Sequence, residues 1–439
     1  MSKILTLLTI FSLLIFSANS SYCQQDIKRE FTLEEAQQYA VSNSYATKDA
    51  SYSVKAAKEK IWESISTGLP QINGSVDYTK NMDIPSVVFN NQTFKMGSDY
   101  DIKYGASVNQ LIFDGSYIVG LQAAKVYLKI SQNAQAKTEI EIRDAVSQAY
   151  YMVLISEKIK DNLEENLKVT KKLYEETKAY FEKGFKEETD ADQVKLLYKN
   201  SEKFYNDAVG QIKVARAVLN FTLGIDIETS ILLKDNLMEF INKVNNNVDN
   251  TSSVNSHIDY KIVENEKKSN KLLLKNAKAA FLPKLNAFYQ IGKSKMTKYA
   301  NPFNTDEDDW ILSSSVGLKL NIPIFHFGYK ISKVNQARFD YLKSENKLEQ
   351  KEQELKRELI VARIEFNNAN QKYNNDKESY ELSKRIFEKT QMKYKEGVSS
   401  SIELSQIHQQ YINTHNTYIQ TLLGLLQAKI KLQKAIGIF

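Results

Sequence analysis

Much of this 439-residue chain places apolar residues three or four positions apart, which is the spacing of one face of an α-helix. In the second half the pattern tightens into a seven-residue repeat. Its aromatic and aliphatic members are Leu359, Phe366, Tyr373, Tyr380, Phe387 and Tyr394. A repeat sustained in this way predicts long helices that pack knobs-into-holes.

The predicted helices are very long. No proline interrupts residues 115–184, and the first break is Gly184. A helix over residues 116–181 would have about 65 residues and a length close to 100 Å at about 1.5 Å per residue. A polar turn follows, and then a second amphipathic stretch at 190–223. This order predicts an antiparallel helical hairpin over 115–223, with its tip at the glycine.

The same arrangement occurs a second time. The glycine that first interrupts the later pattern is Gly397, and a further amphipathic stretch follows at 402–436. We therefore expect a second helical hairpin over 328–436. Leu69-Pro70 also returns as Leu282-Pro283. The displacement is 213 positions for this pair and also for the pair Gly184 and Gly397 (283 − 70 and 397 − 184). A duplication this long indicates that one structural unit occurs twice.

A shorter pattern, with period two, lies before each long helix. Its apolar members in the first copy are Ile72, Gly74, Val76 and Tyr78, and then Ile102, Tyr104, Ala106 and Val108 beyond a polar loop. The second copy has Leu285, Ala287 and Tyr289, a loop with Pro302 and Asp306–Asp309, and then Val316, Leu318 and Leu320. These patterns predict β-hairpins at about 71–113 and 284–323.

One apolar and one polar face are typical of strands between lipid and a lumen, but also of a half-exposed sheet in a soluble protein. Four strands are too few to close a lipid-spanning barrel, whose smallest examples need about eight. A barrel built from this chain would have to be shared between subunits. The duplication divides the chain into a first repeat at 24–227, an Asn- and Ser-rich connector at 228–256 and a second repeat at 257–439.

The N-terminus predicts export. Lys3 precedes a short apolar run, Ile4 to Phe16, and small polar residues follow, so residues 1–23 are interpreted as a signal peptide. No later run of 18 apolar residues occurs, so a mature chain that enters a membrane would do so as a closed β-barrel. Cys23, the only cysteine, excludes an intramolecular disulfide. It could carry lipid, or cleavage could fall near Ser20 or just after Cys23.

Charge and candidate chemistry point away from catalysis. The chain has 59 basic and 53 acidic residues, and the two signs alternate along the helices, so we expect no nucleic-acid partner. No catalytic constellation is found, and we expect neither an enzyme nor a cofactor. His408 and His415 lie seven positions apart and could in principle bridge a metal, but without a third ligand nearby we interpret them as ordinary polar helix positions.

Several motifs resemble those of the TolC family of outer-membrane efflux ducts. They are Phe-Thr-Leu-Glu-Glu-Ala at 31–36, Leu-Pro before each hairpin, Phe-Asp-Gly-Ser or Phe-His-Phe-Gly after it, and Phe/Tyr-x-x-Gly at each helical tip. The resemblance covers essentially the whole mature chain. It implies an α+β, mainly α fold in which a homotrimer shares a 12-stranded outer-membrane barrel and long helices form an α-barrel across the periplasm.

The resemblance also implies a function. Such a protein is a passive duct of a tripartite efflux or type I secretion system in the outer membrane of a Gram-negative-type cell. Its partners are outer-membrane lipid, a periplasmic adaptor and an inner-membrane pump of the RND, ABC or MFS type. The alternative is a periplasmic coiled-coil scaffold without a pore, which would not need two amphipathic hairpins at corresponding places.

Transferred residue by residue, the resemblance places adaptor docking at the two helical tips. The tip residues are Gly184, Phe185, Lys186, Gly397, Val398 and Ser399. The family's best-known duct has two acidic residues after the second tip; here they correspond to Glu403 and Gln406, with Asp190 as the equivalent in the first copy. Three Glu403 side chains would favour cations, whereas Gln406 departs from the pattern. Glu403 and Asp190 are equally suited to the start of a helix.

Overall fold

The computed structural model describes residues 29–89, 92–237, 240, 254–301 and 310–437. The expected signal peptide at 1–23, with Cys23, lies outside these ranges, as do Pro302 and Asp306–Asp309. Most of the expected connector also lies outside them, so the division of the chain into 24–227, 228–256 and 257–439 stays a prediction.

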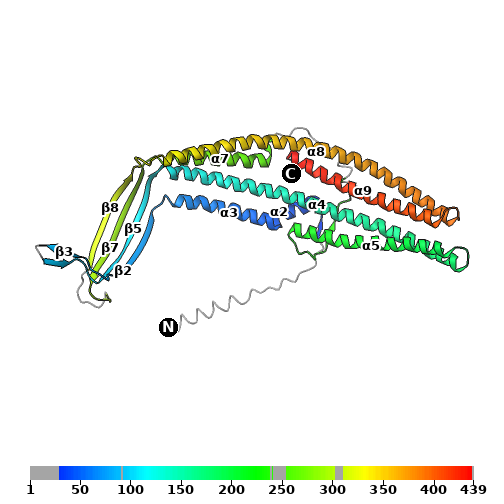
Figure 1. Ribbon diagram of the computed structural model, residues 1–439, viewed down its shortest axis with the longest axis horizontal. Coiled ribbons are helices and arrows are strands. Elements are labelled where there is room, and N and C mark those ends of the chain that lie inside the picture. The colour runs from blue at the N-terminus through cyan, green and yellow to red at the C-terminus, as the bar shows by residue number, and fades with distance from the viewer. Residues whose placement is uncertain (1–28, 90–91, 238–239, 241–253, 302–309, 438–439) are drawn as a thin grey trace.

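Four long helices dominate the molecule (Figure 1). They are α4 (Gly115–Glu182, 68 residues), α5 (Glu188–Leu223, 36 residues), α8 (Tyr329–Lys395, 67 residues) and α9 (Ser401–Ile436, 36 residues). α4 pairs with α5, and α8 pairs with α9, so the two expected antiparallel hairpins are confirmed. None of the helices in the described ranges combines the length and the apolar character that a membrane span requires.

Shorter helices complete the rod on the side of the sheet. α2 (Leu33–Asn43) and α3 (Tyr45–Ser66) lie along α4, and α7 (Ile258–Ala279) lies against α4 and α8. A 3-10 turn, η2 (Val254–Ser256), precedes α7. In Figure 1 α3 and α5 follow one another along α4, just as α7 and α9 follow one another along α8. The rod is therefore about as long as α4 or α8.

A four-stranded antiparallel sheet continues from the helices at one end of the rod (Figure 1). Its strands are β2 (Gln71–Lys80), β5 (Tyr100–Asp114), β7 (Lys284–Thr297) and β8 (Ile311–Asn321), in the order β2-β5-β7-β8. The central pair, β5 and β7, joins the two halves of the duplication in one sheet. β2 and β8 form its edges.

Two small strand pairs differ from the sequence expectation. Part of the expected polar loop in the first copy forms a hairpin of β3 (Ser86–Phe89) and β4 (Gln92–Lys95). β1 (Arg29–Phe31) pairs in parallel with β6 (Ile231–Leu233), which lies in the expected connector. Both were missed because strands of three or four residues are too short to show an alternation.

The core lies where the helices meet. The seven-residue repeat of α8 is buried at Phe366, Tyr373, Phe387 and Tyr394, as its spacing predicts, and Leu359 and Tyr380 are half-buried. Across from this seam, α9 buries Leu422, Leu425 and Leu426. The apolar face of each long helix is thus covered by its neighbours, and burial of this kind supplies most helical stability.

Candidate functional site

The first helical tip reverses the chain at Gly184. This glycine has φ +79°, and its amide donates to the Phe181 carbonyl at 2.8 Å, while the Phe185 amide donates to the Tyr180 carbonyl at 2.9 Å. The left-handed conformation favours glycine, although a Cβ would meet nothing within 4 Å. The next side chain, Phe185, is 74% exposed.

The second tip repeats this geometry. Gly397 has φ +77°, its amide donates to the Tyr394 carbonyl at 3.1 Å, and the Val398 amide donates to the Lys393 carbonyl at 2.8 Å. Val398 is 75% exposed, which matches Phe185. Each hairpin therefore ends in a left-handed glycine followed by an apolar side chain in solvent.

The two turns differ in how the next helix begins. In the second copy Ser400 caps α9 by accepting a hydrogen bond from the Glu403 amide at 3.1 Å, and the Ser399 hydroxyl donates to the Glu403 carboxylate at 2.7 Å. Glu403 thus holds the helix-start position expected as one of its two roles, where the helix dipole favours a carboxylate. Gln406 is exposed. In the first copy Glu187 precedes α5 without a side-chain cap.

Contacts across the two hairpins hold the tips together. The Lys186 ammonium lies 4.6 Å from the centre of the Tyr394 ring, and Lys395 pairs with Glu176 at 2.8 Å. Burial raises the pKa of the Tyr394 hydroxyl, and the nearby negative charge of Asp190 adds to the shift. Asp190 is half-buried. The sequence-derived tip residues are thereby brought to one end of the molecule.

Behind the tips, His408 and His415 are buried rather than ordinary polar helix positions, so that expectation was wrong. They are 4% and 2% exposed. His408 Nε2 lies 3.1 Å from Asn166 Oδ1, which also accepts from the Ser201 hydroxyl at 3.0 Å, and His415 Nε2 lies 3.1 Å from Asn162 Nδ2. This histidine layer joins α9 of one hairpin to α4 and α5 of the other.

The partners fix the protonation of the histidine layer. An amide oxygen only accepts, so His408 Nε2 carries the hydrogen. An amide nitrogen only donates, so His415 Nε2 offers its lone pair. Burial lowers the pKa of both histidines to about 4, and the charge of Lys384 adds to the shift of His415. The described residues contain no group of three or more metal-ligating side chains placed to hold an ion.

The sheet offers a second functional surface because its two faces differ. Register pairs Val76, Tyr104, Lys293 and Leu312 across the four strands, and it pairs Ser75, Gly105, Gly292 and Ser313 in the next row. Since successive side chains point to opposite faces, alternate rows make one face apolar and the other polar. We call the face that carries Tyr104 the apolar face, and the face that carries Ser75 the polar face.

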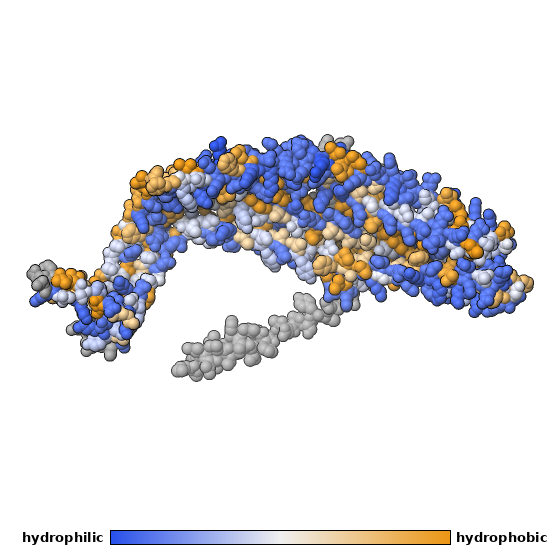
Figure 2. Space-filling model, viewed as in Figure 1, coloured by the Kyte–Doolittle hydropathy of each residue, from blue (hydrophilic) through white to orange (hydrophobic). Residues whose placement is uncertain are grey.

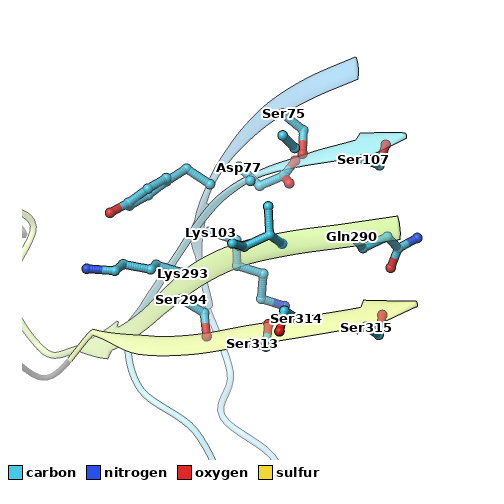
Figure 3. Close-up of a pocket in the computed structure, with 15 residues that line it drawn as sticks. Ser75, Asp77, Lys103, Ser107, Gln290, Lys293, Ser294, Ser313, Ser314 and Ser315 are labelled. Atoms are coloured by element: carbon cyan, nitrogen blue, oxygen red, sulfur yellow. The ribbon is translucent and has the colours of Figure 1, made fainter. Parts of the chain in front are cut away.

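The polar face is hollowed at its centre. Figure 3 shows the hollow, which has a volume of about 520 Å³ and draws on all four strands. Its polar rim consists of Ser75, Asp77, Lys103, Ser107, Gln290, Ser294, Ser313 and Ser315. The floor is Gly105 beside Gly292, where a Cβ on Gly105 would lie 2.6 Å from the Ile291 carbonyl oxygen. The glycine pair thus allows close approach of β5 and β7.

A model of the outer membrane efflux protein family matches residues 37–225 and 273–438. These ranges make up most of the chain and contain both helical hairpins. The chain belongs to this family. A search of curated protein sequences found no match.

Solved structures show the same fold for this outer membrane efflux protein. The Campylobacter jejuni CmeC outer membrane channel matches with a TM-score of 0.74 at 18% identity, over 92% of this chain and 85% of that chain. The Vibrio cholerae outer membrane protein VceC gives 0.70 at 12% identity, over 92% and 96%. The open Neisseria gonorrhoeae MtrE outer membrane channel gives 0.70 at 14% identity, over 92% and 88%.

Family membership places the outer membrane efflux protein in the outer membrane and makes it an efflux channel, a transport role rather than a catalytic one. The resemblance to the TolC family is confirmed, and nothing favours the pore-free scaffold. Sequence reasoning missed the histidine layer, because its partners lie more than 200 positions away. A pairing of polar positions between the two halves would have been the only signal.

Proposed function

We propose that three copies of this efflux channel assemble into one duct, each giving four strands to a shared closed sheet. The open edges of the sheet carry this proposal. Among the described residues, β2 pairs only with β5 and β8 only with β7. An unpaired edge in lipid would leave backbone groups without partners, at a cost of several kcal/mol for each group. A neighbouring copy supplies those partners.

Strand direction supports closure. The strands alternate in direction from β2 to β8, so the β2 of a neighbouring copy would lie antiparallel to β8 without a break in the pattern. Three copies would give the 12 strands expected from the resemblance. That number exceeds the eight or so that the smallest barrels require.

The two faces of the sheet suit lipid outside and water inside. On the apolar face Val76 is 78% exposed, Val316 81% and Leu318 71%, a large apolar area for a protein surface in water. The polar face, with its serine-rich hollow, would line the duct. Exchange of these faces would turn the exposed apolar side chains Val76, Val316 and Leu318 into the lumen.

A belt of exposed apolar residues marks the boundary between sheet and helices. Figure 2 shows apolar side chains gathered at this bend. Ile324 is 91% exposed, Phe325 69% and Phe327 91%, and Leu69 and Leu282 add to the belt. Such residues suit the interface between hydrocarbon and water, so we place the periplasmic surface of the membrane here.

The long helices would carry the duct through the periplasm to the tips. α4 alone, with 68 residues at about 1.5 Å each, extends about 100 Å. Phe185 and Val398 stand in solvent at its far end and offer apolar anchors to a periplasmic adaptor, which connects the duct to an inner-membrane pump of the RND, ABC or MFS type. The channel itself is passive, in an efflux or type I secretion system.

The entrance constriction falls within the same proposal. Asp190 and Glu403 lie one turn behind the two tips, so three copies would arrange them in rings around the entrance. Gln406, one turn further along α9, adds no charge. We therefore expect weak cation preference, with Glu403 held in place by Ser399.

Disulfide cross-linking between the open edges tests the assembly. The substitution Ser75→Cys in β2 is combined in turn with Ser313→Cys, Ser315→Cys or Gly317→Cys in β8. We expect one combination to yield linked dimers and trimers in membranes and nothing larger. Single-cysteine variants are the controls. Absence of any edge-to-edge product in all three combinations would overturn the shared sheet.

A further inference from the structure

Charge is divided between the two faces of the sheet at the end far from the helices. In the rows from Val76 to Lys80, the apolar face carries three lysines and no acidic residue among the described positions. These lysines are Lys80, Lys293 and Lys295. The polar face of the same rows carries both acidic residues, Asp77 and Asp101, together with Lys103. Lysine on a face that is otherwise apolar requires an explanation.

An apolar hollow lies beside one of these lysines. It has a volume of about 490 Å³, and its lining includes Val76, Tyr104, Ala106, Ile291, Lys293 and Leu312. The Tyr104 ring of this lining packs edge-on against Trp310, with 5.1 Å between the ring centroids. Lys293 is half-buried, and no carboxylate of the described chain lies within ion-pair distance of it. Within the described residues, the hollow thus combines an apolar wall with one lysine that has no carboxylate partner.

The position of Lys293 fits the outer boundary of the hydrocarbon. It lies nine residues along β7 from Lys284 (293 − 284), or about 31 Å along the strand. A strand tilt of about 40° reduces this to about 24 Å, close to the roughly 25 Å height of the apolar band of such proteins. An ammonium group is tolerated there because it reaches the level of the lipid headgroups.

From this geometry we infer that the hollow binds one phosphorylated lipid of the outer leaflet, with the phosphate on Lys293 and an acyl chain along Val76, Ala106 and Ile291. Lysine is a strong phosphate partner, and the apolar wall matches a hydrocarbon chain. The inference rests on the proposed function, since it requires the apolar face to meet lipid. Subunits joined edge to edge, as proposed above, would extend the sheet sideways and leave its apolar face, with the hollow, open to lipid.

The test uses the full-length channel in nanodiscs of phosphatidylcholine with lipid A as the phosphorylated probe. After gentle detergent extraction, native mass spectrometry counts the lipid A molecules retained by each assembly. We expect Lys293→Gln to lower retention about tenfold, the effect of losing one charge-assisted contact. Lys293→Arg should retain the lipid.

Lys103→Gln is the matched control, because Lys103 lies in the neighbouring strand but on the polar face. It should leave retention unchanged. Equal retention by Lys293→Gln and the unaltered channel, or equal loss in both glutamine variants, would overturn the inference. The same spectra give the number of chains, so failure to form a trimer is recognised separately as failure of the proposed function.

Discussion

At the scale of single residues, the tip glycines are required for their backbone conformation rather than for space. Gly184 and Gly397 both adopt φ near +80°, and a Cβ at either would enter open space. The cost of a side chain therefore comes from the left-handed conformation alone.

A first prediction follows from this cost of backbone conformation. Gly397→Ala should destabilise the tip by about 1 kcal/mol, because alanine is strained at positive φ. Gly210→Ala is the control: Gly210 is helical, a Cβ there also meets nothing within 4 Å, and alanine should stabilise the helix by up to about 1 kcal/mol. Hydrogen exchange of the tip amides would measure the loss of stability in Gly397→Ala. Equal protection in both variants would refute the account.

The histidine layer predicts a pH dependence. Unfolded histidine has a pKa of about 6.5, whereas burial lowers the pKa of His408 and His415 to about 4. Between these values the unfolded chain binds more protons, so the free energy of unfolding falls as pH falls, by at most about 1.4 kcal/mol per pH unit for each histidine. The stabilisation is fully present above about pH 6.5 and is lost progressively toward pH 4.

Denaturant unfolding followed by circular dichroism at pH 7.5, 6 and 5 measures this slope. His415→Gln keeps an acceptor for Asn162 but cannot titrate, so it should remove about half of the dependence. An unchanged slope would mean that His415 does not carry the linkage.

At the scale of elements, the sequence patterns predicted the long helices and the regular strands of the sheet. The helix expected at 116–181 is Gly115–Glu182, and the hairpins expected at about 71–113 and 284–323 contain the four sheet strands. The β3–β4 hairpin was not predicted, because four-residue strands give too little alternation. The tip glycines were located because a C-terminal glycine is a local signal, whereas the histidine layer depends on contacts between distant halves.

The glycine pair of the central strands gives a prediction about the sheet. Gly105→Val should reduce trimer yield strongly, since its Cβ would lie 2.6 Å from the Ile291 carbonyl oxygen, closer than atoms can approach. Gly74→Ala is the control, because its nearest neighbour would be the Gly105 oxygen at 3.8 Å. Chromatography of extracted protein would compare them. Normal assembly of Gly105→Val would contradict the close packing of β5 and β7.

The tips give a prediction about coupling. Val398→Asp should abolish export while trimer and membrane insertion stay intact, because a charge replaces an apolar anchor that the chain itself leaves exposed. Val398→Leu should export normally. Export assays with a trimer measurement on the same cells would decide between a docking role and a structural one. Loss of the trimer in Val398→Asp would refute the docking role.

At the scale of the whole molecule, the duplication explains why one chain contributes both a sheet and a rod. Each repeat within the chain supplies two strands and one helical hairpin. The two repeats join at β5 and β7 and again at the histidine layer. A single chain still leaves two open edges and one exposed apolar face. Closure of the sheet therefore requires several chains around one axis.

The mass of the membrane-extracted channel tests this requirement most directly. Light scattering in mild detergent, with the detergent contribution subtracted, gives the number of chains in the particle. We expect three times the mass of the mature chain, which is the 50.4 kDa chain less its signal peptide. A particle with the mass of a single chain, stable in buffer without detergent, would contradict it.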